Sequence, residues 1–275
     1  MIEIPEADAL ARQLNESVAG KTISKVEAAH SPHKFAWYQG DPTEYPARLK
    51  GRTLGMANPQ GGTLALQADD MVIALSEGIR LSYHASKTDL PERHQLLLQF
   101  SDGSALSAVV QMYGGLLCFK QGEADNPYYL VATQKPSPLT EAFDRAYFDA
   151  LLQPEELRPL SAKALLATEQ RIPGLGNGVL QDILYNAGLH PKRKLETFSA
   201  QDTDNLFEAL KHTLCQMAEL GGRDTEKDLY GKPGGYATRC SKNTVGKPCL
   251  KCCVQIEKAA YMGGSVYFCP GCQPL

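Results

Sequence analysis

Cys249-Leu250-Lys251-Cys252 and, after sixteen further residues, Cys269-Pro270-Gly271-Cys272 form two C-x-x-C knuckles near the end of this chain. Two cysteines three residues apart can reach one ion from a tight turn, and a hairpin between the knuckles can return to the same ion. Such a site fixes a lobe that is too small to fold around its own core. The spacing therefore predicts one structural zinc ion bound by Cys249, Cys252, Cys269 and Cys272, with a pair of disulfides as the alternative.

Composition indicates a globular protein with a sizeable core. The chain has 275 residues, of which 43% are hydrophobic and 21% charged, enough for two domains of ordinary size. It has no apolar run long enough to span a membrane, and the acidic start MIEIPEADAL does not read as a signal peptide. The remaining cysteines follow no regular pattern, which fits a reducing compartment. We therefore expect a cytoplasmic protein.

Charge is unevenly distributed along the chain. Residues 1–162 carry 14 Lys+Arg against 20 Asp+Glu, a balance of −6, whereas residues 229–275 carry six basic side chains against Glu257 alone. A basic segment that also holds the cysteine knuckles is a candidate phosphate-binding surface. An ordinary solvated lysine face is an equally good explanation on charge alone.

Hydrophobic patterning divides the chain into a β-rich half and a helical half. Leu10, Leu14 and Val18 predict a helix over 6–18. Short segments rich in Val, Ile, Leu and Thr, separated by turn signals, then predict antiparallel strands: 22–29, 52–57, 63–68, 71–76, 79–84, 95–100, 104–111 and 115–120. Helices are expected from Thr140, which can act as the cap, and over 161–169, 178–187 and 202–220.

The segment Ile172-Pro173-Gly174-Leu175-Gly176-Asn177 separates two of the predicted helices. Proline stops the first helix, and the glycines allow a positive φ and close approach of another backbone. Asn177 can cap the next helix, whose free N–H groups suit a phosphate. An ordinary glycine-rich connection remains the alternative for this motif taken alone.

In combination these motifs resemble the Fpg/Nei family of DNA glycosylases. The glycine turn is followed by Ala187-Gly188-Leu189-His190-Pro191 and by the cysteine knuckles, and the start Met1-Ile2-Glu3-Ile4-Pro5-Glu6 is similar to the family's Met-Pro-Glu-Leu-Pro-Glu. The resemblance implies an α+β protein. Its expected parts are an N-terminal antiparallel β-sandwich with a leading helix (1–130), a linker (131–139), a helix–two-turn–helix domain (140–235) and a four-cysteine zinc finger (236–275).

The resemblance also implies a chemistry. In the family, an N-terminal proline amine attacks the sugar C1′ of a flipped-out damaged nucleotide, and a glutamate transfers protons. Glu3 matches that glutamate, and Glu6 matches a residue that supports the N-terminal turn. Ile2 replaces the proline, which leaves the α-amine of Met1 as the candidate nucleophile.

Only some of the family's DNA-contacting positions have matching residues in this chain. Lys163, Gly176 and Asn177 match positions that bind phosphate. Met112 or Tyr113, in the stretch that matches the intercalating loop, could fill the gap left by an extruded base, with a strand end packed in the sandwich as the alternative. The hairpin stretch 58–63 lacks the family's lysine, and Gly264 replaces an arginine. Lys258 is one of the nearby lysines that could compensate.

Four other features have structural explanations that we favour over functional ones. We expect His94 to be a surface histidine, His190 to be structural and Trp37 to lie in the core. The mixed charges of 223–228 are expected to form a solvated face.

The sequence thus predicts a monomeric base-excision-repair glycosylase that acts on damaged or abasic DNA, with or without lyase activity. The alternatives are a damaged-DNA-binding protein that has lost catalysis on the same scaffold and, more weakly, an enzyme that removes bulky or crosslinked adducts from single strands.

Overall fold

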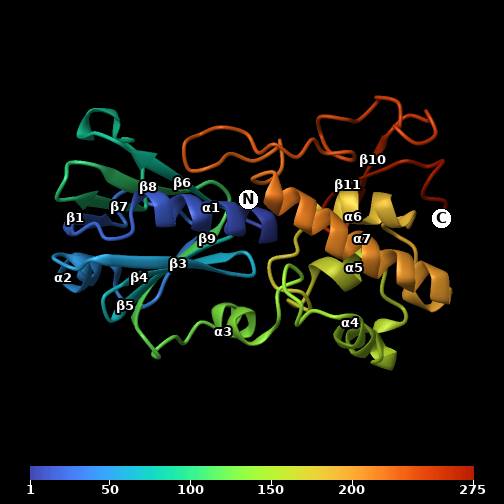
Figure 1. Ribbon diagram of the computed structural model, residues 1–275, viewed down its shortest axis with the longest axis horizontal. Helices are drawn as coiled ribbons and strands as arrows, with labels where there is room; N and C mark the ends of the chain where they lie inside the picture. Colours follow the sequence, from blue (N-terminus) through green and yellow to red (C-terminus); the bar gives the residue numbers. More distant parts are fainter.

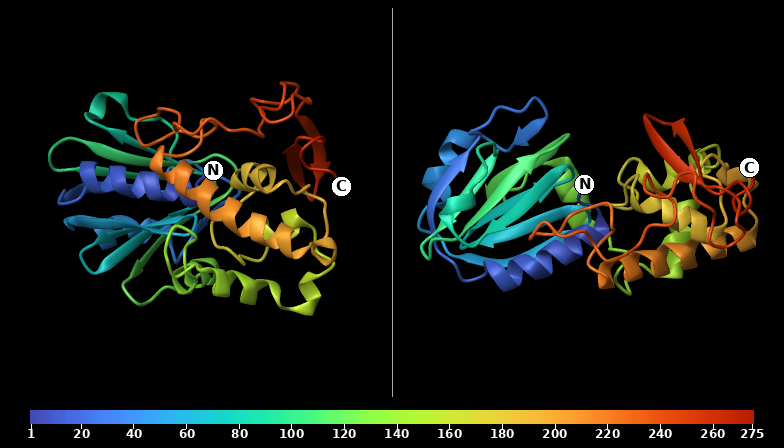
Figure 2. Two further views of the ribbon diagram at one scale, coloured as in Figure 1. Left: turned by 45° about the vertical axis from the view of Figure 1, so that its right-hand side comes forward. Right: turned by 90° about the horizontal axis from the view of Figure 1, so that it is seen from above.

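A β-lobe occupies the first half of the chain and a helical lobe the second, with the N-terminus at their junction (Figures 1 and 2). The computed structural model describes residues 1–275 except the side chain of Lys87. No described helix has the length and apolar composition needed to cross a membrane. The architecture confirms the predicted α+β class.

Two sheets pack face to face in the β-lobe. The antiparallel four-stranded sheet has the order β1 (Ile23–Ala28), β7 (Leu96–Phe100), β8 (Ala105–Val110) and β6 (Ile79–His84). The five-stranded sheet has the order β2 (Ala36–Tyr38), β9 (Gly114–Lys120), β5 (Met71–Ser76), β4 (Thr63–Ala68) and β3 (Leu54–Gln60). Only β2 runs parallel to its neighbour, β9. Three short helices complete the lobe: η1 (Pro42–Glu44), α2 (Tyr45–Leu49) and η2 (Lys87–Asp89).

The helical lobe begins after α3 (Pro127–Gln134), in whose last turn the predicted linker 131–139 starts. Its helices are α4 (Arg145–Leu152), η3 (Glu155–Leu157), α5 (Ala162–Ala167), α6 (Val179–Ala187), η4 (Leu195–Thr197) and α7 (Ala200–Glu219), and the hairpin of β10 (Glu257–Tyr261) and β11 (Gly264–Phe268) follows. Thr140 does not cap α4, because that helix starts later. Asp144 caps it, accepting the Tyr147 N–H at 2.8 Å.

Helix α1 (Ile4–Ser17) connects the cores of the two lobes. Leu10 and Leu14 belong to the sandwich core, whereas Ile4 packs into the helical core with Phe143 and Leu210. The leading helix is therefore shared by both lobes, and its first residues lie at their junction.

Candidate active site and phosphate-binding region

The first residues of the chain are held between the lobes by backbone hydrogen bonds. The Ile2 N–H donates to the Glu77 carbonyl at 2.7 Å, and the Ile4 N–H donates to the Gly174 carbonyl in the turn before α6 at 3.0 Å. Ile2 is buried in the sandwich core. The α-amine of Met1 forms an ion pair with the carboxylate of Glu226. The amine therefore has a defined position at the junction.

Glu3 caps helix α6, whose N-cap residue lies 175 residues later in the chain. Its Oε1 accepts the Gly178 N–H at 2.9 Å and its Oε2 accepts the Val179 N–H at 2.8 Å. A carboxylate is favoured there because the first N–H groups of a helix lack partners and carry positive partial charge. Burial raises the pKa of Glu3, although Arg223 opposes the shift. A carboxyl with a raised pKa is suited to proton transfer.

The prediction that Asn177 caps α6 is wrong. Gly178 occupies the N-cap position and has no side chain to contribute, and Glu3 supplies the acceptors instead. The sequence around Asn177 could not reveal the true cap of α6, because the capping carboxylate comes from the other end of the chain.

Arg223 connects the two N-terminal glutamates. Its Nε donates to Glu6 Oε1 at 2.9 Å and its Nη2 to Glu6 Oε2 at 2.8 Å, while Nη1 lies 3.6 Å from Glu3 Oε2. The three side chains are at most 6% exposed. Buried charges are tolerated when they are paired and hydrogen-bonded in this way. Our interpretation of 223–228 as a solvated face is therefore wrong for Arg223, and Glu226 of the same run binds the Met1 amine.

Glycines allow the close packing at this centre. Gly174 has a φ of +79°, and a Cβ there would lie 2.1 Å from the Gly62 nitrogen of the β3–β4 hairpin. A Cβ on Gly176 would lie 2.8 Å from the Glu3 carboxyl carbon, and one on Gly178 would lie 1.5 Å from Arg223 Nη1. The predicted close approach of another backbone to this turn is confirmed.

Lys163 and Asn177 lie together beside the β10–β11 hairpin. Lys163 Nζ donates to the Tyr261 carbonyl at 2.7 Å, and Asn177 Nδ2 donates to the Ser265 carbonyl at 3.1 Å. Asn177 Oδ1 is buried and has no hydrogen-bond partner among the described residues. A Cβ on Gly264 would lie 3.4 Å from Lys163 Nζ and 3.7 Å from Asn177 Oδ1. A longer side chain at position 264 would therefore extend from this pair of polar groups.

The other two predicted nucleic-acid contacts are both exposed. Met112 is 60% exposed in the loop between β8 and β9. Lys258 is exposed on β10, paired with Tyr267.

The four knuckle cysteines form one cluster. Cys249 Sγ lies 3.7 Å from Cys272 Sγ, and Cys252 Sγ lies 3.4 Å from Cys269 Sγ. All four sulfur atoms lie within 4.8 Å of one another. A tetrahedral zinc ion with Zn–S bonds of about 2.3 Å requires sulfur separations of about 3.8 Å. The donor set and its spacing therefore fit a zinc ion, whereas both disulfides would need S–S distances of about 2.05 Å.

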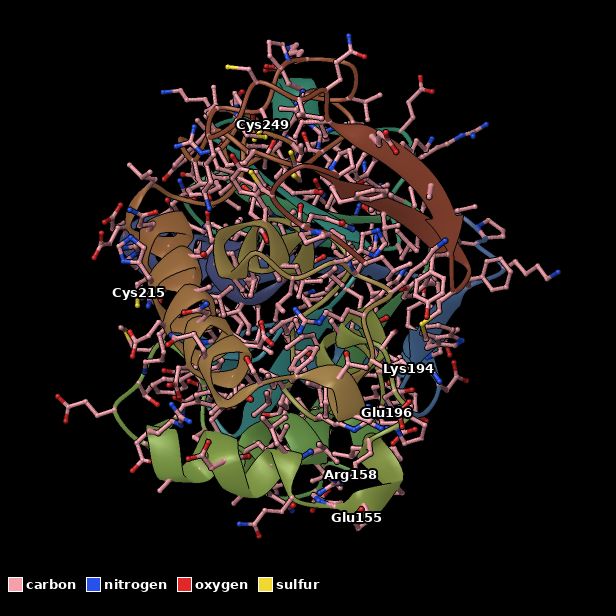
Figure 3. The ribbon with its side chains drawn as sticks, turned by 90° about the vertical axis from the view of Figure 1, so that its right-hand side faces the viewer. Glu155, Arg158, Lys194, Glu196, Cys215 and Cys249 are labelled. Atoms are coloured by element: carbon pink, nitrogen blue, oxygen red, sulfur yellow. The ribbon has the colours of Figure 1, made fainter. Side chains whose placement is uncertain are left out.

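Neighbouring groups position this cluster. Tyr185 on α6 places its hydroxyl 3.2 Å from Cys249 Sγ, and Asp182, also on α6, accepts the Arg239 and Cys240 N–H groups at 2.8 and 2.7 Å. The cluster is thus attached to the helix that Glu3 caps. Figure 3 shows Cys249 among other sulfur atoms at the top of this face, with Cys215 apart from them on α7.

We expected His190 to be structural, Trp37 to lie in the core and His94 to lie on the surface. His190 is buried, with its ring edge-to-face against Phe268 at 4.4 Å, as expected for a structural residue. His94 is not a surface residue, because it is only 4% exposed and lies 3.4 Å from Glu27. Trp37 is not in the core, because it is 49% exposed on the edge strand β2.

Comparisons with known proteins agree along the whole chain. Residues 1–111 match the family model of the formamidopyrimidine-DNA glycosylase N-terminal domain. Formamidopyrimidine-DNA glycosylases of Bacillus cereus and Shouchella clausii are 27% and 28% identical over 280 residues, covering 100% of this chain and 99% of each relative.

Solved structures show the same fold. Lactococcus lactis Fpg in complex with abasic-site DNA has a TM-score of 0.84 at 22% identity, covering 99% of this chain and 100% of that one. The MutM (Fpg) protein of Thermus thermophilus has a TM-score of 0.81 at 24% identity, covering 98% of each chain. The first 111 residues of this chain therefore match the family model of these glycosylases, and its full length is similar to them in sequence and in fold.

Proposed function

We propose that this protein is a base-excision-repair DNA glycosylase that binds damaged or abasic DNA at the junction of its lobes. The observation that carries the proposal is the junction itself, where an ion-paired α-amine, a buried proton-transfer carboxyl and a glycine turn at a helix start meet. Relatives similar over the full chain are named formamidopyrimidine-DNA glycosylases, and the Lactococcus lactis protein was solved with abasic-site DNA.

The proposed reaction uses Met1, Glu3 and Glu226. The ammonium group of Met1 first gives a proton to the carboxylate of Glu226, with which it is paired. The neutral nitrogen then attacks C1′ of the flipped-out nucleotide, and the glycosidic bond breaks with its electron pair leaving on the base. The departing base takes up the proton that the nitrogen loses once the N–C1′ bond has formed. Glu3, in its protonated form, then donates to the sugar ring oxygen as the ring opens and the Schiff base forms. Glu6 and Arg223 hold Glu3 in position.

The substrate backbone is assigned to the region of Lys163, Gly176 and Asn177, with Met112 as the candidate wedge and Lys258 as a peripheral contact. One zinc ion, held by the four knuckle cysteines, would fix the hairpin that Lys163 and Asn177 contact. The protein is expected to act as a monomer, in the cytoplasm where the chromosomal DNA lies.

Borohydride trapping on duplexes that contain an abasic site or an oxidised base tests this function. Wild-type protein should give a covalent adduct, and mass spectrometry of the adduct should place it on Met1. Glu3→Gln should reduce trapping at least about a hundredfold, the range of general acid–base catalysis. An adduct on a lysine, or undiminished trapping by Glu3→Gln, would contradict the assignment.

A second candidate is a damage-binding protein without turnover. The observation in its favour is that Lys163 and Asn177 donate to hairpin carbonyls next to Gly264, where the family has an arginine. Tight, salt-dependent binding of abasic DNA with neither base release nor an adduct would support this candidate.

A further inference from the structure

An exposed surface of mostly aromatic side chains lies beside the N-terminus, and the proposed function uses only Met112 of it. We define the aromatic rim as Phe35, Trp37, Met112 and Tyr113. Phe35, Trp37 and Met112 are 47%, 49% and 60% exposed. Large apolar side chains gathered at this exposure mark a binding surface more often than scattered single ones do.

Backbone pairing connects the rim to the site. Strand β2 pairs with the start of β9, Trp37 opposite Gly115, and the Gly114 N–H donates to the Phe35 carbonyl at 3.0 Å. The rings of Trp37 and Tyr113 lie 5.9 Å apart, and the Tyr113 hydroxyl lies 4.0 Å from Met1 Sδ. Tyr113 therefore links Met1 to Trp37 on the edge strand of the five-stranded sheet.

The chemistry of the rim selects its ligand. Exposed rings bind flat apolar faces, and Lys34 Nζ lies 5.2 Å from the Phe35 ring, where a cation can meet a phosphate. Bases inside a duplex are stacked on both faces, so a protein ring can reach a base face only where the stack is broken.

We propose that the aromatic rim binds unpaired nucleobases of the damaged strand by stacking, so that this protein prefers lesions in single-stranded or unpaired DNA. This inference rests on the proposed DNA-repair function and names its substrate class. Stacking would contribute to binding where basic side chains are missing, because positions 58–63 carry no basic residue and position 264 is glycine. Binding should then depend less steeply on salt than binding through phosphate contacts alone.

Trp37 is the single tryptophan of the chain, so its fluorescence reports on the rim directly. The probes are a single-stranded oligonucleotide with a tetrahydrofuran abasic site and the same strand in a fully paired duplex. Saturating single strand should quench Trp37. Trp37→Ala should weaken single-strand binding about tenfold and duplex binding less than twofold, while Trp37→Phe should keep most of the affinity.

Met56→Ala is the matched control, because Met56 is 54% exposed on β3, at the opposite edge of the same sheet. It should bind both probes as the wild type does. Wild-type affinity for the single strand in both Trp37→Ala and Phe35→Ala, or unchanged Trp37 fluorescence at saturation, would overturn the inference. Self-association that Trp37→Ala abolishes, without an effect on DNA, would instead make the rim a contact between copies and overturn it as well.

The two proposals fail in different ways. If the wild type binds neither probe at low salt, the proposed DNA-repair function itself is wrong. If it binds the duplex as tightly as the single strand, and Trp37→Ala weakens neither, only the rim inference is wrong.

Discussion

Arg223→Met tests how the junction is held together. Arg223 lies between Glu3 and Glu6, with all three side chains at most 6% exposed. Methionine fills a similar volume but removes the positive charge, so two buried carboxylates are left without a counter-charge. Breaking a buried pair in this way costs about 3–5 kcal/mol. For a chain of this size we expect a fall in Tm of roughly 10 °C, measured by circular dichroism.

The loss of stability in Arg223→Met should depend on pH, and the direction of this dependence follows from the pKa of Glu3. Burial already raises the pKa of Glu3 above its ordinary 4.5, and removing Arg223 takes away the charge that opposes the shift. A carboxyl with a raised pKa binds its proton more tightly in the folded protein, so its contribution favours folding at low pH. That contribution is lost as pH rises above 4.5 through the raised pKa. The penalty of Arg223→Met should therefore be smaller at pH 5 than at pH 8.

Arg158→Met is the control, because Arg158 pairs with Glu155 on the surface, where the side chains are 61% and 78% exposed (Figure 3). It should change stability by less than about 1 kcal/mol. Adding Glu6→Gln to Arg223→Met should recover part of the loss. An Arg223→Met protein as stable as Arg158→Met, or a penalty that does not change with pH, would refute the reasoning.

Three further predictions concern the metal and the glycines. Atomic absorption should find one zinc per chain, and Cys272→Ser should lose it together with DNA binding, whereas Cys215→Ser, away from the cluster on α7, should lose neither. Gly178→Ala should abolish trapping, because its methyl would lie 1.5 Å from Arg223 Nη1, while Gly264→Ala, with 3.4 Å to Lys163 Nζ, should be tolerated. Gly264→Arg should tighten DNA binding and steepen its salt dependence by about one unit of slope in a titration, since it restores a phosphate contact beside Asn177. An unchanged slope would argue against a phosphate at that position.

The elements with a strong local signal could be predicted from the sequence. All eight expected strands form, because β-branched and leucine-rich runs lie between clear turn signals. The cysteine cluster was predictable from spacing alone. β2 has only three residues, too few for an alternating pattern, and α3, whose last four residues overlap the predicted linker, was not expected. The cap of α4 was misplaced because Thr140 and Asp144 are both good caps and local pattern does not choose between them.

The centre of the candidate site was less predictable, because its partners are distant in sequence. Glu3 and Glu6 were identified through the family resemblance, but nothing local distinguishes Arg223 and Glu226 from a solvated charge run. Arg223 donates to a residue 217 positions earlier. Trp37 was misplaced for a similar reason, since the exposure of an edge strand depends on what the rest of the chain leaves uncovered.

The helix cap supplied by Glu3 has a consequence for synthesis. Residues 3 and 6 leave the ribosome early, whereas residues 178 and 223, which neutralise and hold them, follow much later. Domains tend to fold in the order in which they are made. The β-lobe must therefore emerge before Glu3 and Glu6 have their partners, and a prematurely terminated chain would carry the Met1 amine without Glu226 and Arg223.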